Sequence, residues 1–203
     1  MYNEKLRFFV CKCDDNSIHL RLILVKMKPQ LIVITGGPGT GKTTIIEHMV
    51  ADGHCCYPEI SRQITLEARE QGIEQLFLEQ PLLFSELLLE GRKKQYFLAQ
   101  EEVQSFTFLD RGIPDILAYM HYIGDSYPAF FEEACAGHRY DKVFILPPWE
   151  AIYVSDEARY ENFEQAQLIY RHLQETYRHF GYSPIEVPVG PVADRMAFIL
   201  NQL

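Results

Sequence analysis

The residues best suited to chemistry in this sequence lie in one stretch, where an apolar segment runs into a glycine-rich loop that ends in lysine and threonine. The stretch reads LIVITGGPGTGKTT over residues 31–44 and fits the pattern G-x-x-x-x-G-K-[ST]. Glycines let successive backbone N–H groups point at one anion, and the following helix adds the positive end of its dipole. We therefore predict a phosphate-binding P-loop for a nucleotide, made of Gly36, Gly37, Pro38, Gly39, Thr40, Gly41, Lys42, Thr43 and Thr44.

Three side chains are predicted to carry the phosphate chemistry. Lys42 should reach the β- and γ-phosphates, and the Thr43 hydroxyl should ligate Mg²⁺. Asp110 ends the apolar run of residues 106–109, where an acidic residue is the expected second partner of Mg²⁺; the alternative is a solvated carboxylate at a strand end. The N-K-x-D motif with which GTPases read their base is absent from the sequence, so ATP with Mg²⁺ is the predicted ligand.

The residue after Asp110 separates two classes of nucleotide-using protein. Motor and remodelling ATPases usually place a glutamate there to polarise the attacking water, whereas this chain has Arg111. Transfer of phosphate to an acceptor needs no such hydrolytic base, and a guanidinium is suited to hold an anionic or polar substrate. Arg111 is therefore a predicted substrate-binding residue, and the pair favours a kinase.

The amino-acid composition limits the classes of binding partner and the cellular compartment that we expect for this protein. The chain has 203 residues with a net charge of −9, which argues against a broad nucleic-acid or anionic-membrane surface. No apolar run approaches the ~18 residues that would span a bilayer, and the first thirty residues lack the order of a signal peptide. Five cysteines without C-x-x-C spacing suit reduced thiols in the cytoplasm. The expected partner is a small-molecule phosphate acceptor, without nucleic acid or membrane.

Apolar strands alternate with helical segments along most of the chain. Strands are expected at 31–36, 54–57, 106–109, 142–146 and 183–187, and helices at 43–50, 60–71, 81–104, 115–123, 128–136, 163–180 and from 191 onward. Gly91 interrupts the longest helical segment, so two helices are an alternative there. Such alternation predicts βαβ crossovers and a mainly parallel sheet covered on both faces.

The chain divides into two unequal parts. Residues 1–28 form an N-terminal extension, for which a β-hairpin and a poorly ordered tail are both open, and residues 29–203 form the P-loop ATP-binding domain. Ligands of such sheets bind outside the carboxyl ends of the strands. The P-loop, Glu59, Asp110 and Pro147 should therefore gather at one edge.

Several motifs together resemble a known group of proteins. They are ITGGPGTGKTT (34–44), PEISR (58–62), FLDRGIPD (108–115), YDKVFILPPW (140–149) and PVGP (188–191). This set resembles the small AAA-type predicted ATPases of bacteria, which are similar to the ribosylnicotinamide kinase domain of NadR-type regulators and, more distantly, to thymidylate and deoxynucleoside kinases. The resemblance implies an α/β P-loop NTPase fold, a nucleoside/nucleotide-kinase-like three-layer sandwich. The H-x-G-H signature and DNA-binding region of the NadR-type regulators are absent from this sequence, so adenylyl transfer and operator binding are not predicted.

The resemblance also implies roles for residues outside the P-loop. Glu59 would contact or deprotonate the acceptor hydroxyl, with Arg62 binding substrate beside it; capping the following helix is the alternative for Glu59, and a solvated helix face for Arg62. Arg159 would close as a lid over the γ-phosphate, or else pair with its acidic neighbours on the surface. Val189 and Gly190 would pack the adenine ring.

Three functional hypotheses follow from these residues. The first is a kinase with a nucleoside-like acceptor, in which Lys42, Asp110, Arg159 and Glu59 are the catalytic residues. The second is an ATPase or nucleotide-dependent switch that acts on a protein partner, with the N-terminal extension as a docking edge. The third is an ATP-binding protein without turnover.

Overall fold

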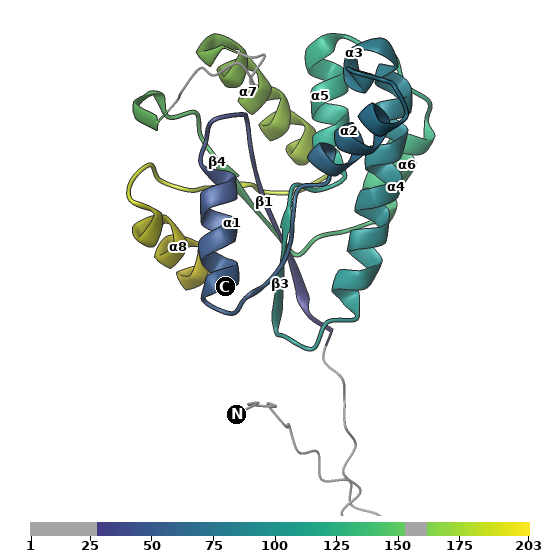
Figure 1. The fold of residues 1–203 in the computed structure, drawn as a ribbon. Coiled ribbons are helices and arrows are strands. Elements are labelled where there is room, and N and C mark those ends of the chain that lie inside the picture. Colours follow the sequence, from purple (N-terminus) through teal and green to yellow (C-terminus); the bar gives the residue numbers. More distant parts are fainter. Residues whose placement is uncertain (1–27, 153–161) are drawn as a thin grey trace, which may run out of the picture.

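A computed structural model describes residues 28–152 and 162–203 of the chain (Figure 1). All but the last residue of the predicted N-terminal extension lies outside the described residues. The predicted lid residue Arg159 also lies outside them. The described elements, in order, are β1 (Gln30–Gly36), α1 (Lys42–Ala51), β2 (Cys55–Tyr57), α2 (Ser61–Glu70), α3 (Leu76–Glu79), α4 (Pro81–Gln100), β3 (Phe106–Asp110), α5 (Pro114–Ile123), α6 (Phe130–Gly137), β4 (Lys142–Leu146), a 3-10 turn (Glu150–Ile152), α7 (Phe163–His179), β5 (Ile185–Glu186) and α8 (Val192–Asn201).

The five strands form one sheet in the order β2-β3-β1-β4-β5, and all four pairings are parallel. The prediction of a mainly parallel sheet is thus confirmed. The register sets Ile34 of β1 opposite Asp110 of β3, and Gly36 opposite Leu146 of β4. The carboxyl ends of these three strands therefore meet around the start of the P-loop.

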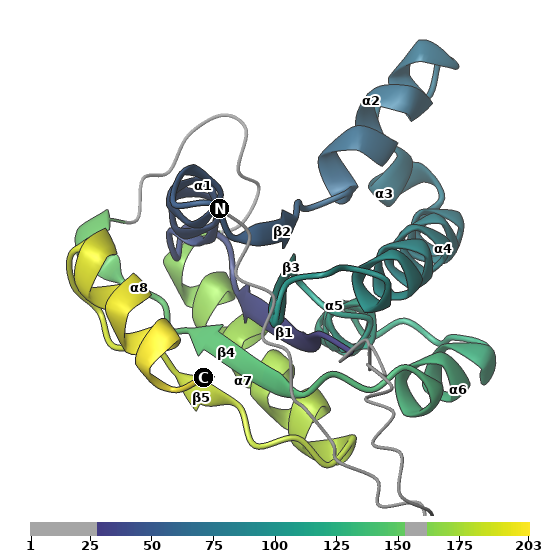
Figure 2. The same cartoon turned by 90° about the horizontal axis from the view of Figure 1, so that it is seen from below.

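Helices cover both faces of the sheet, which gives three layers (Figure 2). Side chains alternate between the faces of a strand. In β1, Ile32 and Ile34 pack with α1 and α8, whereas Leu31 and Val33 pack with α4, α5 and α7. These four side chains are at most 2% exposed, so β1 is the centre of the hydrophobic core.

The long helix α4 is continuous through Gly91 and ends at Gln100, so the alternative of two helices was wrong. Gly91 packs against another segment: a Cβ atom there would lie 2.4 Å from Cδ1 of Ile60, which directly precedes α2. The short helix α3, between α2 and α4, was not predicted.

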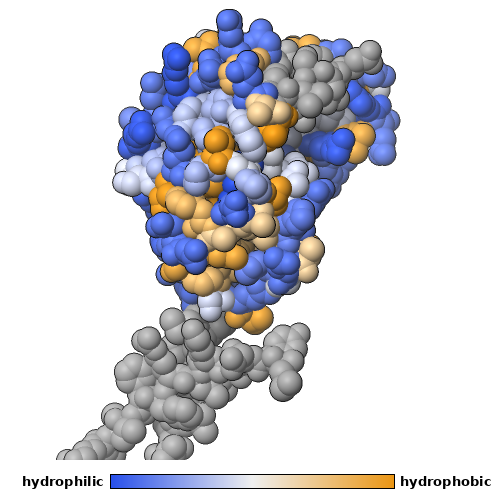
Figure 3. All heavy atoms as spheres, turned by 90° about the vertical axis from the view of Figure 1, so that its left-hand side faces the viewer, coloured by the Kyte–Doolittle hydropathy of each residue, from blue (hydrophilic) through white to orange (hydrophobic). Residues whose placement is uncertain are grey.

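The surface carries both hydrophilic and hydrophobic side chains. On the side that Figure 3 displays, hydrophilic side chains surround smaller hydrophobic areas. Within residues 28–152 and 162–203, no helix has both the length and the apolar composition needed to cross a bilayer.

Candidate functional site

The P-loop joins β1 to α1 and depends on glycine for its shape. Gly39 and Gly41 have φ angles of 70° and 80°, a left-handed conformation that residues with a side chain rarely adopt. Gly36 is required for close packing, because a Cβ atom there would lie 2.7 Å from the carbonyl oxygen of Leu146. The Thr40 hydroxyl donates to the Gly37 carbonyl oxygen over 3.0 Å and closes the turn.

Lys42 lies folded back onto the loop that it follows. Its Nζ atom donates to the carbonyl oxygens of Gly36 and Gly37, both at 2.8 Å, and the side chain is 8% exposed. Burial, together with the positive charge of Arg111, lowers the pKa of Lys42 to about 7. A phosphate that replaced the two carbonyl oxygens would favour the charged ammonium.

Asp110 ends β3 and offers an unused oxygen. Its Oδ1 atom is buried and has no hydrogen-bond partner among the described residues. Burial raises the pKa of Asp110, against the attraction of the Lys42 ammonium. Buried polar atoms are normally paired, so this oxygen fits a role toward a cation or a cation-bound water.

Thr43 is the other predicted metal ligand, and it is exposed in the first turn of α1. The described residues contain no cluster of three or more His, Cys, Asp or Glu side chains that could hold a metal ion by themselves. This donor set suits Mg²⁺, which commonly takes one or two protein oxygens and completes its shell with phosphate and water.

Glu59 follows β2 and is held by two arginines. It forms a salt bridge with Nε of Arg111, and its Oε1 atom lies 3.4 Å from Nη2 of Arg92 in α4. The same oxygen accepts a hydrogen bond from the Ser61 backbone N–H over 3.2 Å, so Glu59 also caps the start of α2. Burial alone would raise its pKa, but the two arginines hold the pKa at about 2.

Arg111 connects three parts of the site. Besides its salt bridge with Glu59, its Nη1 atom lies 3.2 Å from the Gly36 carbonyl oxygen and 3.2 Å from Oδ1 of Asp115. Its φ angle is 73°, an uncommon value for a residue with a side chain. The surrounding contacts therefore hold this residue in a strained backbone conformation.

The Asp115 carboxylate forms a salt bridge with the Arg111 guanidinium. Its buried carboxylate accepts bonds from Thr35 Oγ1 at 2.5 Å, Tyr177 Oη at 2.5 Å, the Gly112 N–H at 3.0 Å and Arg111 Nη1 at 3.2 Å. All of its bonding capacity is engaged by the protein, which makes Asp115 a positioning residue.

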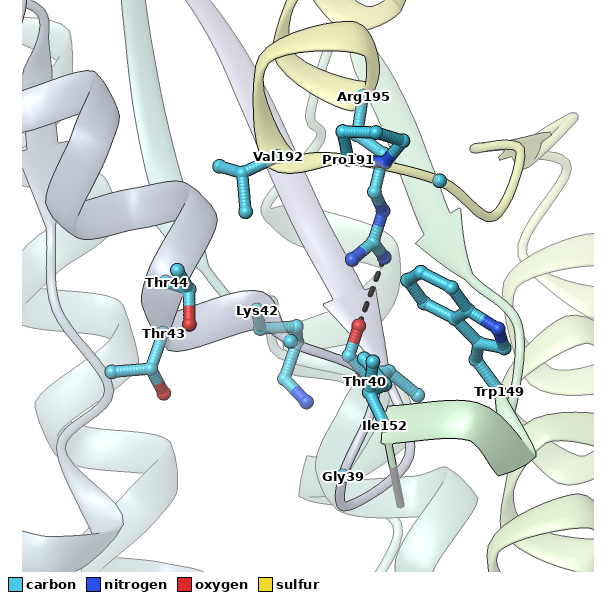
Figure 4. Close-up of a pocket in the computed structure, with 12 residues that line it drawn as sticks. Gly39, Thr40, Lys42, Thr43, Thr44, Trp149, Ile152, Pro191, Val192 and Arg195 are labelled. Atoms are coloured by element: carbon cyan, nitrogen blue, oxygen red, sulfur yellow. Dashed lines mark hydrogen bonds between the residues drawn. The ribbon is translucent and has the colours of Figure 1, made fainter.

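A pocket of about 450 Å³ opens beside the P-loop (Figure 4). Its lining consists of Gly39, Thr40, Gly41, Lys42, Thr43, Thr44, Trp149, Ile152, Gly190, Pro191, Val192 and Arg195. The structure thus brings the end of the P-loop, the segment after β4 and the start of α8 together. Of the predicted base-binding pair, Gly190 lines the pocket, whereas Val189 is 51% exposed and is not part of the lining.

Other predicted residues lie apart from this pocket. Glu59, Asp110 and Arg111 gather on the opposite flank of the P-loop, around Gly36. Arg62 is exposed on α2. Arg159 lies outside the described residues.

Sequence reasoning missed two buried arginines and assigned no role to the one tryptophan that lines the pocket. Arg92 lies in the sequence GRKK, which resembles a solvated helix face, yet its side chain is 4% exposed and donates to the Gly112 carbonyl oxygen over 2.7 Å. Arg195 is 2% exposed in the terminal helix. Neither arginine had a motif to identify it, whereas Trp149, in the motif that ends PPW, is the only tryptophan of the chain.

Comparison with solved structures confirms the predicted fold. Deoxyadenosine kinase from M. mycoides with dCMP and dCDP is 17% identical with a TM-score of 0.61, over 85% of this chain and 97% of that chain. The NadR protein in complex with NR is 17% identical with a TM-score of 0.64, over 85% of this chain and 49% of that chain. Thymidylate kinase from Candida albicans is 16% identical with a TM-score of 0.57, over 86% of this chain and 91% of that chain. At these identities the likeness concerns the fold.

Comparison of sequences gives a family. No curated protein matches the chain. A family described as an AAA domain matches residues 31–195, which is most of the 203 residues and includes the P-loop, Asp110 and Arg195. The chain therefore belongs to this AAA domain family.

Proposed function

We propose that this protein is a kinase that transfers the γ-phosphoryl group of ATP to a small, nucleoside-like acceptor. The observation that carries the proposal is the salt bridge between Glu59 and Arg111, which a hydrogen bond ties to Gly36 at the start of the P-loop. A charged pair next to the phosphate site suits a polar acceptor with hydroxyl groups. The likeness to a deoxyadenosine kinase, a thymidylate kinase and the NadR protein in complex with NR supports the same class of acceptor.

The P-loop side is assigned to the nucleotide. The backbone amides of residues 36–44 and the start of α1 hold the phosphates, and Lys42 Nζ exchanges its two carbonyl partners for phosphate oxygens. Thr43 and Asp110 would hold Mg²⁺, which would neutralise charge on the phosphates. Arg159 is assigned to close over the γ-phosphate and exclude water.

The other flank is assigned to the acceptor. Glu59 stays ionised because its pKa is about 2, so it can accept a hydrogen bond from the acceptor hydroxyl at physiological pH. Arg111, and Arg62 on α2, would bind other polar groups of the acceptor. Arg92 donates to the Glu59 carboxylate, holds it in position and is therefore a positioning residue.

The proposed reaction forms one bond and breaks one. The acceptor oxygen bonds to the γ-phosphorus, the bond between that phosphorus and the β–γ bridging oxygen breaks, ADP leaves, and the hydroxyl proton passes to water. Phosphoryl transfer through a loose transition state needs little from a base. Glu59, whose low pKa makes it a weak base, therefore orients the hydroxyl more than it removes the proton.

The test is ADP release from ATP with Mg²⁺, in the presence and absence of nucleosides, nucleoside monophosphates and ribosylnicotinamide. One acceptor should stimulate release, and Lys42→Ala should abolish the stimulation. Lys93→Ala is the matched control, because it removes a lysine on α4 that pairs with Glu90 on the surface. Mass spectrometry of the stimulating acceptor should find it heavier by one phosphoryl group.

Release that ignores every acceptor while ATP still binds would contradict the kinase proposal. It would favour the ATPase or nucleotide-dependent switch acting on a protein partner. We place the reaction in the cytoplasm, which the free thiols of Cys55, Cys56 and Cys135 support.

A further inference from the structure

The pocket beside the P-loop has two chemically different sides (Figure 4). One side is the P-loop and the first turn of α1, with Lys42, Thr43 and Thr44. The other side consists of Trp149 and Ile152, which follow β4, and Arg195, which projects from α8. This second side contains an aromatic ring and a guanidinium, a combination that phosphates alone do not require.

Arg195 is fixed against the P-loop. Its Nη2 atom donates to the Thr40 carbonyl oxygen over 2.9 Å, and the side chain is 2% exposed. Gly41 packs against the same guanidinium: a Cβ atom there would lie 2.9 Å from Nη1 of Arg195. The Nε atom of Arg195 is buried without a hydrogen-bond partner among the described residues, so the protein does not use the whole guanidinium.

Trp149 stands at the edge of the pocket and is only partly buried. Its ring centroid lies 5.9 Å from Cζ of Arg195. It belongs to none of the three clusters of buried apolar side chains that form the core of the described residues. Pro147 and Pro148 precede it and restrict the backbone that carries the indole to this position.

We infer that Trp149 and Arg195 form the binding site for the heteroaromatic base of the nucleotide whose phosphates the P-loop holds. The base stacks on the indole, and Arg195 lies beside the stack as a cation and hydrogen-bond donor. Flat heteroaromatic rings gain affinity from both contacts. The inference rests on the proposed function and adds two base-binding residues that lie on elements other than the loop of Val189 and Gly190.

Trp149 also provides the test, because it is the only tryptophan of the chain. Its fluorescence is followed while the full chain is titrated with ATP or with inorganic tripolyphosphate, each with Mg²⁺, and isothermal calorimetry measures binding independently. Both ligands should bind, but only ATP should change the emission substantially, since only ATP carries a base.

Variants separate the base from the phosphates. Trp149→Leu should weaken ATP binding by about 5- to 150-fold, the range for loss of one base-stacking aromatic, and should leave tripolyphosphate binding within about twofold. Trp149→Phe should restore most of the ATP affinity. Tyr170→Leu is the matched control, because Tyr170 lines a separate hollow with Pro148 and Gln174; it should leave the affinity for both ligands unchanged.

Three results would overturn the inference. ATP could bind by calorimetry without changing Trp149 emission, Trp149→Leu could bind ATP as well as the natural chain does, or it could lose affinity for both ligands equally. In each case the natural chain still binds ATP, so the proposed kinase function survives. Failure of the natural chain to bind either ligand would reject both the inference and the proposed function.

Discussion

The hydroxyl of Tyr177, in α7, donates a hydrogen bond of 2.5 Å to Oδ2 of Asp115, in α5, and both side chains are fully buried. Asp115 in turn contacts Arg111, whose guanidinium reaches Glu59 and the carbonyl oxygen of Gly36. A continuous chain of polar contacts thus runs from the helix layer to the end of the sheet where the P-loop begins.

Tyr177→Phe should lower the free energy of unfolding by about 1.5–3 kcal/mol, because it removes one of four donors from a buried carboxylate. Urea unfolding at pH 7 measures this change. Tyr170→Phe is the control: its hydroxyl bonds to Glu186 at the surface, so the cost should stay below about 1 kcal/mol. Equal losses in the two variants would argue against a special role for the buried bond.

Gly112→Ala should destabilise the protein by about 1–3 kcal/mol through overpacking, because the new Cβ atom would lie 2.6 Å from Oη of Tyr177. The double variant Gly112→Ala/Tyr177→Phe removes the hydroxyl that lies nearest to the new Cβ atom. It should therefore lose less stability than the two single changes together, by at least about 0.5 kcal/mol. Additive losses in a double-mutant cycle would mean that the two residues do not interact in this way.

Glu59→Gln should lower the free energy of unfolding by about 2–3 kcal/mol at pH 7. This is less than for a fully buried ion pair, because Glu59 is 24% exposed. Since the pKa of Glu59 falls from 4.5 to about 2 on folding, its stabilising contribution is present above about pH 4.5 and is lost as the pH falls toward 2. The difference in stability between the natural chain and Glu59→Gln should consequently shrink between pH 5 and 3, as measured by urea unfolding; a constant difference would contradict the assigned ionisation.

We expect Lys42 to take up a proton when the nucleotide binds. Its pKa of about 7 in the free protein means that it is mostly neutral at pH 8, and phosphate oxygens should restore the charged form. Binding of ATP with Mg²⁺ at pH 8 should take up most of one proton and should weaken by about an order of magnitude between pH 6 and 8. Calorimetry in buffers of different ionisation enthalpy measures the uptake.

The control for Lys42 is Lys42→Arg, which stays charged throughout this range. Any nucleotide that it binds should be bound without the pH dependence. The same low pKa also makes the stability of the fold depend on pH. Because the unfolded chain keeps the Lys42 proton up to about pH 10.5, this residue raises the free energy of unfolding as the pH rises from about 7 to 10.5. Identical proton uptake in the natural chain and Lys42→Arg would contradict the assignment to Lys42.

The sequence predicted the features that depend on local pattern. The apolar run before the glycine-rich loop indicated β1, and the run before Asp110 indicated β3; both exist with nearly the expected bounds. It also indicated that strand-end residues meet at one edge of a parallel sheet, and Ile34 does lie opposite Asp110. Such predictions succeed because hydrophobic period and turn chemistry are properties of short segments.

The rest depended on contacts between distant segments. Arg92 reaches Glu59 across 33 positions and Arg195 reaches Thr40 across 155, and neither distance leaves a local signal. Gly91 looked like a helix break because propensity alone disfavours glycine. In the folded chain the side chain of Ile60 occupies the space that a Cβ atom at Gly91 would need, and that contact leaves no local signal in the sequence.

The central place of β1 in the sheet has a consequence for how this protein can diverge. Arg111 and Glu59 follow β3 and β2 on one side of β1, whereas Trp149 and Arg195 follow β4 and β5 on the other (Figure 2). Under the proposed assignment, acceptor selection and nucleotide selection therefore occupy separate halves of one sheet edge. We therefore expect that substitutions around α2 and α4 change the choice of acceptor and leave nucleotide binding intact.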